Sequence, residues 1–281
     1  MLVSFASASL PRTMRPVTFI KWGGSLITDK TGRFSVRTDV LERLADELAR
    51  YHADAPNAPL VLGHGSGSFG HVAAREAGFG PNAALDNPAP ALSHIQAAAA
   101  ALHQHVMHAL RDAGLPVFSW APSSAFVTTQ GTPQLDAAAP VQHALSAGAL
   151  PVTYGDVMLD TEHGLSICST ETVFRTLIAA LQAQGIPVAR VLWCGNTDGV
   201  YDADGHTLPH LTAEQARAMI GDVHAPGGTD VTGGMALRLR TASVLAEHGI
   251  DSLLLNGTVP GRFAAALRND PDVHRTHIAA G

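Results

Sequence analysis

Apolar runs alternate with amphipathic stretches along most of this 281-residue chain. The run VTFIKW at 17–22 predicts a first strand, and PLVLGH at 59–64 predicts another. Apolar residues at helical spacing between them predict a helix over 38–51. The later segments continue this rhythm. Further helices are predicted over 91–113, 137–147, 171–184, 232–248 and 260–268, further strands over 115–120, 150–155, 188–194, 252–256 and 272–279, and a hairpin over 157–168.

Strands that alternate with helices are typical of a sheet covered on both faces. The pattern therefore predicts an open αβα sandwich with a central, mostly parallel sheet. Residues 14–281 are expected to form one domain, because no low-complexity linker interrupts them. Residues 1–13 lack the basic and apolar regions of a signal peptide, and we expect either a disordered extension or a misplaced start codon there.

Composition narrows the classes of partner. The net charge is −6 without any basic cluster, which argues against nucleic acid and anionic membranes as partners. No apolar run reaches membrane-spanning length. Cys168 and Cys194 lie outside any CxxC pattern, as is usual in a reducing compartment. We therefore expect a cytoplasmic protein.

The positive charges are distributed unevenly between the two residue types. Lysine and arginine together number 18, but only Lys21 and Lys30 are lysines, and both lie within KWGGSLITDK. An ammonium group is a compact point charge on a flexible stem, unlike the planar guanidinium fork. Their proximity indicates a site that requires ammonium groups, such as a phosphate site.

Glycine-rich segments follow four of the predicted strands. They lie at 23–25, 63–71, 154–156 and 195–202, and a fifth, at 227–235, begins a helix. Ligands of open parallel sheets bind beyond the carboxyl ends of the strands. Together these segments predict an edge lined with backbone N–H groups, which suits several phosphates.

The segment GHGSGSFGH at 63–71 matches two known phosphate motifs only in part. Gly65, Gly67 and Gly70 have the spacing of a dinucleotide fingerprint, but they follow the second strand, and no strand end near 86–91 supplies a ribose-binding carboxylate. A P-loop would need lysine and serine or threonine where His71 and Val72 stand. The failed match to the dinucleotide fingerprint disfavours an NAD-dependent oxidoreductase, and the failed match to the P-loop disfavours a P-loop nucleotide site.

A better match comes from six motifs in a fixed order: KWGGS, ITDK, HGSGSFGH, PVTYGD, DGVYD and DVTGGM. Together they resemble the amino acid kinase superfamily and, within it, the isopentenyl phosphate kinases, over nearly the whole chain from Met14. GSFGH is the most specific piece: most relatives carry a triple-glycine loop without the histidine, and fosfomycin kinases carry GAFGH. The resemblance implies an acceptor-binding lobe at 14–165 and a nucleotide-binding lobe at 166–281.

The resemblance also implies roles for individual residues. The expected catalytic residues are Lys21 and Lys30, which would face the transferred γ-phosphate, and His71, which would hold the acceptor phosphate. The expected ATP-binding residues are Lys21, Gly23, Gly24, Ser25, Ser66, Gly67, Asn196, Asp198, Tyr201, Thr232, Gly233 and Arg238. The expected acceptor-binding residues are Gly65, Ser66, His71, Gly155 and Asp156. Mg²⁺ would accompany ATP, held mainly by the phosphates.

The chemistry of the acceptor supports a histidine independently. A phosphate monoester has its second pKa near 6, so at pH 7 it is largely a dianion. Such a nucleophile needs no general base; it needs a donor that fixes it in line, which His71 can supply. The alternative is a histidine on a surface loop with no role.

Three positions depart from the implied pattern. Asn196 stands where an aspartate is usual, Arg238 where a lysine is usual, and Glu171 where an aspartate positions the catalytic lysines. Glu171 is therefore the expected lysine-positioning carboxylate, one methylene longer than usual. These departures leave nucleotide affinity and preference open.

The resemblance thus implies an ATP-dependent kinase that converts isopentenyl phosphate to isopentenyl diphosphate by direct in-line transfer. The alternatives left open are a fosfomycin-type phosphonate kinase, a kinase of another small alkyl phosphate, and a non-catalytic nucleotide sensor. A homodimer also stays open.

The predicted helix over 91–113 carries two further groups of interest. Its three histidines, 103, 105 and 108, lack carboxylate or cysteine partners at ligand spacing, so we expect a solvated or lid-facing helix side rather than a metal site. Its apolar residues Ile95, Ala98, Leu102 and Met107 are candidates for a wall of the acceptor pocket, with their orientation undecided.

Overall fold

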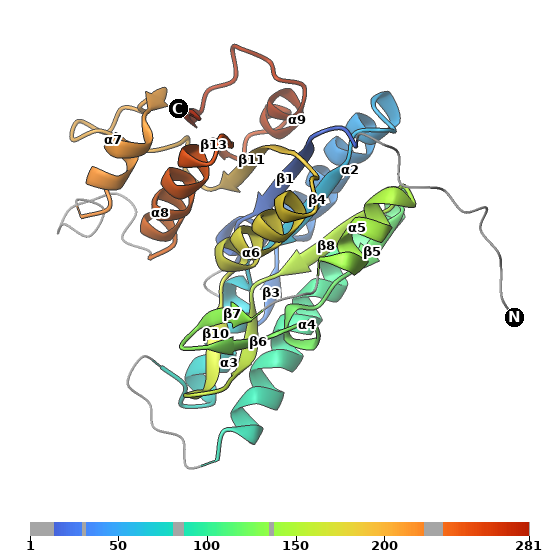
Figure 1. Ribbon diagram of the computed structural model, residues 1–281, viewed down its shortest axis with the longest axis vertical. Helices are drawn as coiled ribbons and strands as arrows, with labels where there is room; N and C mark the ends of the chain where they lie inside the picture. The colour runs from blue at the N-terminus through green and yellow to red at the C-terminus, as the bar shows by residue number, and fades with distance from the viewer. Residues whose placement is uncertain (1–13, 30–31, 81–86, 135–137, 222–232, 281) are drawn as a thin grey trace, which may run out of the picture.

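The computed structural model describes residues 14–29, 32–80, 87–134, 138–221 and 233–280. A central sheet of eight strands crosses both proposed lobes (Figure 1). In spatial order its strands are β12 (His210–Leu211), β14 (Thr276–Ile278), β13 (Asp251–Asn256), β11 (Val188–Gly195), β1 (Val17–Trp22), β4 (Leu60–His64), β8 (Leu150–Tyr154) and β5 (Val117–Ser119). Every pairing except β13 with β14 is parallel, which confirms the predicted mostly parallel sheet.

Helices cover the two faces of the sheet. The larger helices are α2 (Thr38–Asp54), α3 (Gly67–Glu76), α4 (Ala89–Asp112), α5 (Ala139–Ser146), α6 (Thr170–Ala183) and α8 (Gly233–Glu247). The shorter ones are α1 (Gly24–Ile27), α7 (Ala213–Ala218), α9 (Arg262–Leu267) and a 3₁₀ turn (Pro122–Ser124). Figure 1 shows α6 in front of β1 and β4.

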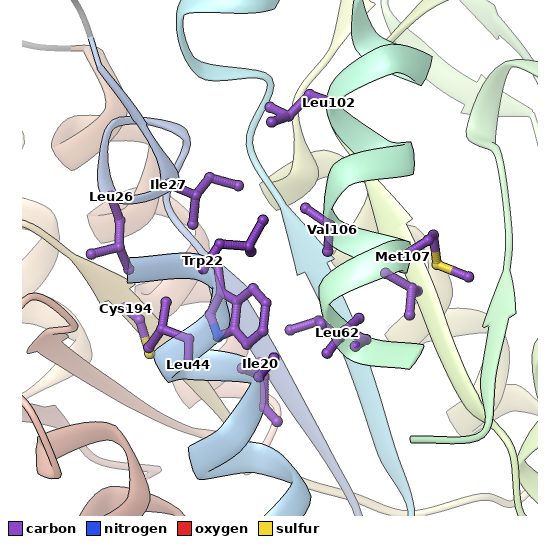
Figure 2. Close-up of a cluster of buried hydrophobic side chains, with 14 of the residues drawn as sticks. Ile20, Trp22, Leu26, Ile27, Leu44, Leu62, Leu102, Val106, Met107 and Cys194 are labelled. Carbon is purple, nitrogen blue, oxygen red and sulfur yellow. The ribbon is translucent and has the colours of Figure 1, made fainter. Parts of the chain in front are cut away.

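Alternation along β1 divides the core into two layers. Ile20 and Trp22 point to the layer formed with α2, α4 and α9, and Figure 2 shows Trp22 beside Leu44 and Val106 in that layer. Val17 and Phe19 point the other way, to α6 and α8. Successive side chains of a strand alternate between faces. Lys21 therefore shares the face of Phe19, toward α6 and α8.

A smaller sheet and one small hairpin lie beside the main sheet. The smaller sheet contains, in spatial order, β10 (Gly164–Cys168), β9 (Asp156–Asp160), β6 (Val127–Thr129) and β7 (Thr132–Gln134). The small hairpin pairs β2 (Thr28–Asp29) with β3 (Ser35–Val36). The antiparallel β9–β10 pair confirms the predicted hairpin.

The sequence pattern missed several elements, of which α3 matters most for the site. This helix begins inside the glycine-rich segment that was expected to be a loop. Phe69 and Ala73, four residues apart, are buried and anchor α3 to the core. Because the segment is rich in glycine, the helical spacing of these two apolar residues is hard to recognise in the sequence. No helix within the described ranges is long and apolar enough to cross a membrane.

Candidate active site

Four neighbouring strands end at one edge of the central sheet. They are β11, β1, β4 and β8, which are adjacent and parallel, so their carboxyl ends coincide. A glycine-rich segment follows each of them. The structure thus brings together four of the five segments that the sequence singled out.

The first two glycine loops contact each other through their backbones. A Cβ atom built on Gly24 would lie 2.6 Å from Gly67 Cα, and one built on Gly65 would lie 2.7 Å from Gly24 N. Gly67 also has φ +52°, a conformation that favours glycine. No side chain fits between the loops, so glycine is required on both sides.

Thr28 ties the same two loops together. Its Oγ1 donates to the Gly24 carbonyl at 2.8 Å and accepts from the Ser68 N–H at 3.0 Å. Thr28 follows α1, which directly continues the first glycine turn. One hydroxyl therefore joins the turn after β1 to the first turn of α3.

A buried cluster of three charged side chains lies next to these loops. The Lys21 ammonium donates to Glu171 Oε1, and Arg238 Nε lies 3.8 Å from the same oxygen. All three residues are buried. They come from β1, α6 and α8, on the face of the sheet where the alternation along β1 places Lys21. The cluster carries two positive charges and one negative charge, so it attracts an anion.

Burial and charge oppose each other in setting the ionisation of this cluster. Burial raises the pKa of the Glu171 carboxyl, but the charges of Lys21 and Arg238 outweigh it and bring the pKa below its ordinary value. Burial lowers the pKa of the Lys21 ammonium, which Glu171 counteracts and Arg238 reinforces. Together these effects leave the pKa of Lys21 below its ordinary value, and Glu171 is the group that favours its charged form.

Two glycines lie next to the Arg238 guanidinium. A Cβ atom on Gly195 would lie 3.0 Å from Arg238 Nη1, and one on Gly23 would lie 3.8 Å from Nη2. The guanidinium thus lies over the ends of β1 and β11. A side chain at Gly195 would therefore crowd the guanidinium, whereas the distance from Gly23 is an ordinary van der Waals contact.

The segment after β11 is held by specific contacts. Asn196 Nδ2 donates to the Ser25 carbonyl at 2.8 Å, which links the loops after β11 and β1. The Asp198 carboxylate contacts Arg262, and the Asp198 N–H donates to the Tyr201 hydroxyl at 3.0 Å. Asn196 therefore serves as a donor to the backbone.

The residues expected to bind the acceptor lie at the ends of β4 and β8. Ser66 precedes α3, and His71 is exposed on the same helix. The Gly155 N–H donates to the His64 carbonyl at 3.0 Å. Asp156 is buried and accepts from the amides of Ser123, at 3.3 Å, and Val157, at 2.9 Å.

Burial raises the pKa of the Asp156 carboxyl, and the hydrogen bonds from its amide partners oppose this rise. Because its oxygens hold backbone amides, Asp156 shapes the turn after β8. Lys30 and Thr232 lie outside the described residues, and Gly233 is the first residue of α8.

The expectation for the histidines of α4 was wrong at one position. His105 and His108 are exposed, but His103 is buried and its Nδ1 lies 3.0 Å from His64 Nε2. Its neighbours Ala99, Leu102 and Val106 are buried as well, so His103 lies within the apolar stripe of the helix. Its spacing from those residues was the overlooked signal.

The proposed apolar wall belongs to the core. Ile95, Ala98, Leu102 and Met107 are all buried in the layer around Trp22. Figure 2 shows Val106 on the side of α4 that faces β4, near Leu62, whereas the Met107 side chain extends away from β4. These side chains belong to the same core cluster as residues of β1, β4 and β8.

Two other features of the surface lie outside the charged cluster. A cavity of about 280 Å³ lies at the opposite, amino-terminal ends of β4 and β8, where Leu60 and Leu150 line it. Asp202, Asp204 and His206 form an exposed cluster after β11, in which Asp202 Oδ1 accepts from the amides of the other two. These hydrogen bonds stabilise a local turn, which explains why the three side chains lie close together.

Comparisons with known proteins agree with this geometry. The model of the amino acid kinase family matches residues 16–256. An isopentenyl phosphate kinase of Methanothermobacter thermautotrophicus is 31% identical over 271 residues, which cover 92% of this chain and 97% of the relative. An isopentenyl phosphate kinase of Haloferax volcanii is 33% identical over 252 residues, 86% of this chain and 96% of the relative. A crystal structure of isopentenyl phosphate kinase superposes with a TM-score of 0.73 at 27% identity, and the match covers 93% of this chain and 100% of that one.

Proposed function

This chain belongs to the amino acid kinase family, and we propose on that premise that it transfers the γ-phosphate of ATP to isopentenyl phosphate, giving isopentenyl diphosphate. The observation that carries the proposal is the buried Lys21–Glu171–Arg238 cluster beside two touching glycine loops. The relatives at 31% and 33% identity, both named isopentenyl phosphate kinases, favour this acceptor over the alternatives.

The cluster supplies the electrostatic part of the reaction. Phosphoryl transfer needs little covalent chemistry from a protein, only alignment and stabilisation of negative charge. Lys21 and Arg238 share a single carboxylate, so one positive charge stays uncompensated for the transferred phosphoryl group. Lys30 would add a second ammonium group there. Gly23, Gly24, Ser25 and Gly67 would bring backbone amides close to the phosphates of ATP.

The remaining ATP contacts come from the C-terminal half. Asn196, Asp198 and Tyr201 would border the nucleotide after β11, and Thr232 and Gly233 would present the start of α8 to a phosphate. The described carboxylates nearest this edge already have partners: Glu171 holds Lys21, Asp156 holds amides, and Asp198 contacts Arg262. This suits a Mg²⁺ ion that is held by the phosphates and water and that neutralises charge on ATP.

The acceptor would bind where β4 and β8 end. Gly65, Ser66 and Gly155 would line its phosphate, and exposed His71 would donate to it from α3. Because the acceptor phosphate is largely a dianion at pH 7, one of its oxygens attacks the γ-phosphorus without a base. The new P–O bond forms as the bond to the ADP oxygen breaks, and ADP leaves.

The proposal is tested by ADP release with isopentenyl phosphate, dimethylallyl phosphate and fosfomycin measured side by side. We expect the prenyl phosphates to react much faster than fosfomycin, with a diphosphate product visible by ³¹P NMR. A Lys21→Met enzyme purified in the same way controls for contaminating kinases. Faster turnover of fosfomycin would assign a phosphonate kinase, and ATP binding without transfer to any acceptor would assign a nucleotide sensor.

A further inference from the structure

Two buried histidines lie directly behind the second glycine loop. His64 ends β4 and is 0% exposed, and His103 of α4 is 2% exposed. His64 Nε2 lies 3.0 Å from His103 Nδ1, and His103 Nε2 lies 2.8 Å from Ser119 Oγ on β5. At its other end the pair reaches the glycine loop, where His64 Nδ1 lies 3.1 Å from the Gly65 carbonyl oxygen.

Both rings are neutral at pH 7. Burial, reinforced by His103, lowers the pKa of His64 to about 3, and burial lowers the pKa of His103 to about 4. A neutral imidazole has one donor nitrogen and one acceptor nitrogen. Each ring can therefore donate at one end of the chain only.

The Gly65 carbonyl fixes the direction of every bond in this chain. A carbonyl oxygen can only accept, so His64 carries its proton on Nδ1 and accepts at Nε2. His103 must then donate from Nδ1 and accept at Nε2 from the Ser119 hydroxyl. The result is one directed chain of hydrogen bonds that runs from Ser119 through His103 and His64 to Gly65.

The last bond also determines where the next amide points. A peptide unit is planar, and in the trans form its C=O and N–H point in opposite directions. The described part of the chain has no cis peptide bonds. Because the Gly65 carbonyl turns toward His64, the Ser66 N–H turns away from it. Among the described residues, no backbone carbonyl accepts from that N–H.

The backbone on the other side of His64 is held as well. The His64 carbonyl accepts from Thr170 Oγ1 at 2.7 Å and from the Gly155 N–H at 3.0 Å. The His64 ring stacks on Tyr154 with 5.6 Å between centroids. The ring and the carbonyl of His64 are thus both fixed. Its hydrogen bond to the Gly65 carbonyl therefore holds the Gly65–Ser66 peptide in a single orientation.

We propose that His64 and His103 are positioning residues, whose hydrogen bonds lock the Gly65–Ser66 peptide so that the Ser66 N–H donates to the acceptor phosphate. The inference rests on the proposed function, in which Gly65 and Ser66 line the acceptor site. Neither histidine touches substrate; both act through the backbone of the glycine loop.

A role in packing alone makes a different prediction. The His103 ring also packs on Tyr154, at 4.4 Å between centroids. If only ring shape mattered, phenylalanine would replace His103 without loss. If the hydrogen bonds matter, phenylalanine fails and glutamine succeeds, because its amide can donate to His64 and accept from Ser119.

The test compares His103→Phe, His103→Gln and the control His108→Phe, which makes the same change at an exposed position of α4. Melting temperature, kcat and both Michaelis constants are measured. We expect kcat/KM for the acceptor to fall about tenfold in His103→Phe, the effect of roughly one lost hydrogen bond, with the KM of ATP nearly unchanged. His103→Gln should recover most of the loss, and His108→Phe should match the wild type. Equal acceptor kinetics in His103→Phe and the wild type would overturn the proposal, whatever the melting temperatures.

A second measurement is independent of any substrate. Long-range ¹H–¹⁵N NMR of the wild type reports which nitrogen of each histidine carries the proton. We expect the proton on Nδ1 of both His64 and His103. A proton on Nε2 of His64 would overturn the directed chain of hydrogen bonds. A wild type that turns over no acceptor would refute the proposed function, and the NMR result would still decide the hydrogen-bond chain.

Discussion

The carboxylate of Glu171 accepts a hydrogen bond from the Lys21 ammonium in the layer between β1 and α6. The same oxygen, Oε1, lies 3.8 Å from Nε of Arg238. One anion thus compensates two buried cations from separate elements. Its removal affects both the fold and the charge offered to a phosphate.

Glu171→Gln should be harmful in two ways. Two buried cations would face each other without a counter-charge, and breaking such a pair costs about 3–5 kcal/mol of unfolding free energy. Without Glu171 the pKa of Lys21 should fall further, which weakens its charge. Urea denaturation and ADP release measure the two effects. Glu42→Gln, at an exposed position of α2, is the matched control, and wild-type turnover in Glu171→Gln would argue against the role of the cluster.

His71→Ala should affect the acceptor alone. His71 is exposed on α3, so little stability should be lost. Loss of a donor to a charged phosphate costs roughly 1.5–3 kcal/mol, so we expect kcat/KM for the acceptor to fall by about 10- to 100-fold. The KM of ATP should change little. His108→Ala removes another exposed histidine as a control, and an unchanged acceptor response in His71→Ala would refute this assignment.

Gly24→Ala should disrupt the contact between the two glycine loops. The added Cβ would lie 2.6 Å from Gly67 Cα, and backbone atoms on both sides cannot move independently. We expect a loss of stability of about 1–3 kcal/mol and a larger loss of turnover. Gly80→Ala is the control, because a Cβ there meets nothing within 4 Å. Wild-type activity in Gly24→Ala would show that the loops can separate.

The buried histidines predict how stability depends on pH. Their pKa values in the folded protein, about 3 for His64 and about 4 for His103, lie below the ordinary 6.5. As the pH falls below about 6.5, the unfolded chain binds protons that the folded chain does not, so stability is lost. Each histidine contributes a slope of up to about 1.4 kcal/mol per pH unit until its folded pKa is reached.

His103→Gln should therefore reduce this slope between about pH 6 and pH 4.5. Urea denaturation at several pH values measures the effect. His108→Gln serves as the control for loss of a histidine from α4. Parallel curves for the wild type and His103→Gln would contradict the buried, neutral state of His103.

The sequence predicted much of the site because its signals are local. The glycine-rich segments each follow an apolar run, and parallel strands carry such segments to one edge. That β11, β1, β4 and β8 are neighbours could not be read from local patterns, because strand order depends on contacts between distant segments. The pairing of Lys21 with Glu171, 150 positions apart, was available only through family resemblance.

The burial of His103 shows a limit of predicting burial from sequence patterns. The residue lies within the apolar stripe of α4, but a histidine there is equally compatible with a solvated site until the elements that pack against the helix are known. Its partner, His64, lies 39 positions away on β4. A polar residue on an apolar helix face has no defined role until its partner is known.

The contact of the two glycine loops has a consequence for how the enzyme could diversify. Thr28 joins loops that meet backbone to backbone, with no side chain between them. Under the proposed reaction, the gap that the phosphoryl group crosses is then set by contacts between the two backbones, which only substitutions of the touching glycines or of Thr28 would disturb. Mutations in the surrounding side chains could alter the size or polarity of the accepted molecule and leave that gap as it is. Selection could thus exchange acceptors gradually, without passing through variants that have lost the reaction itself.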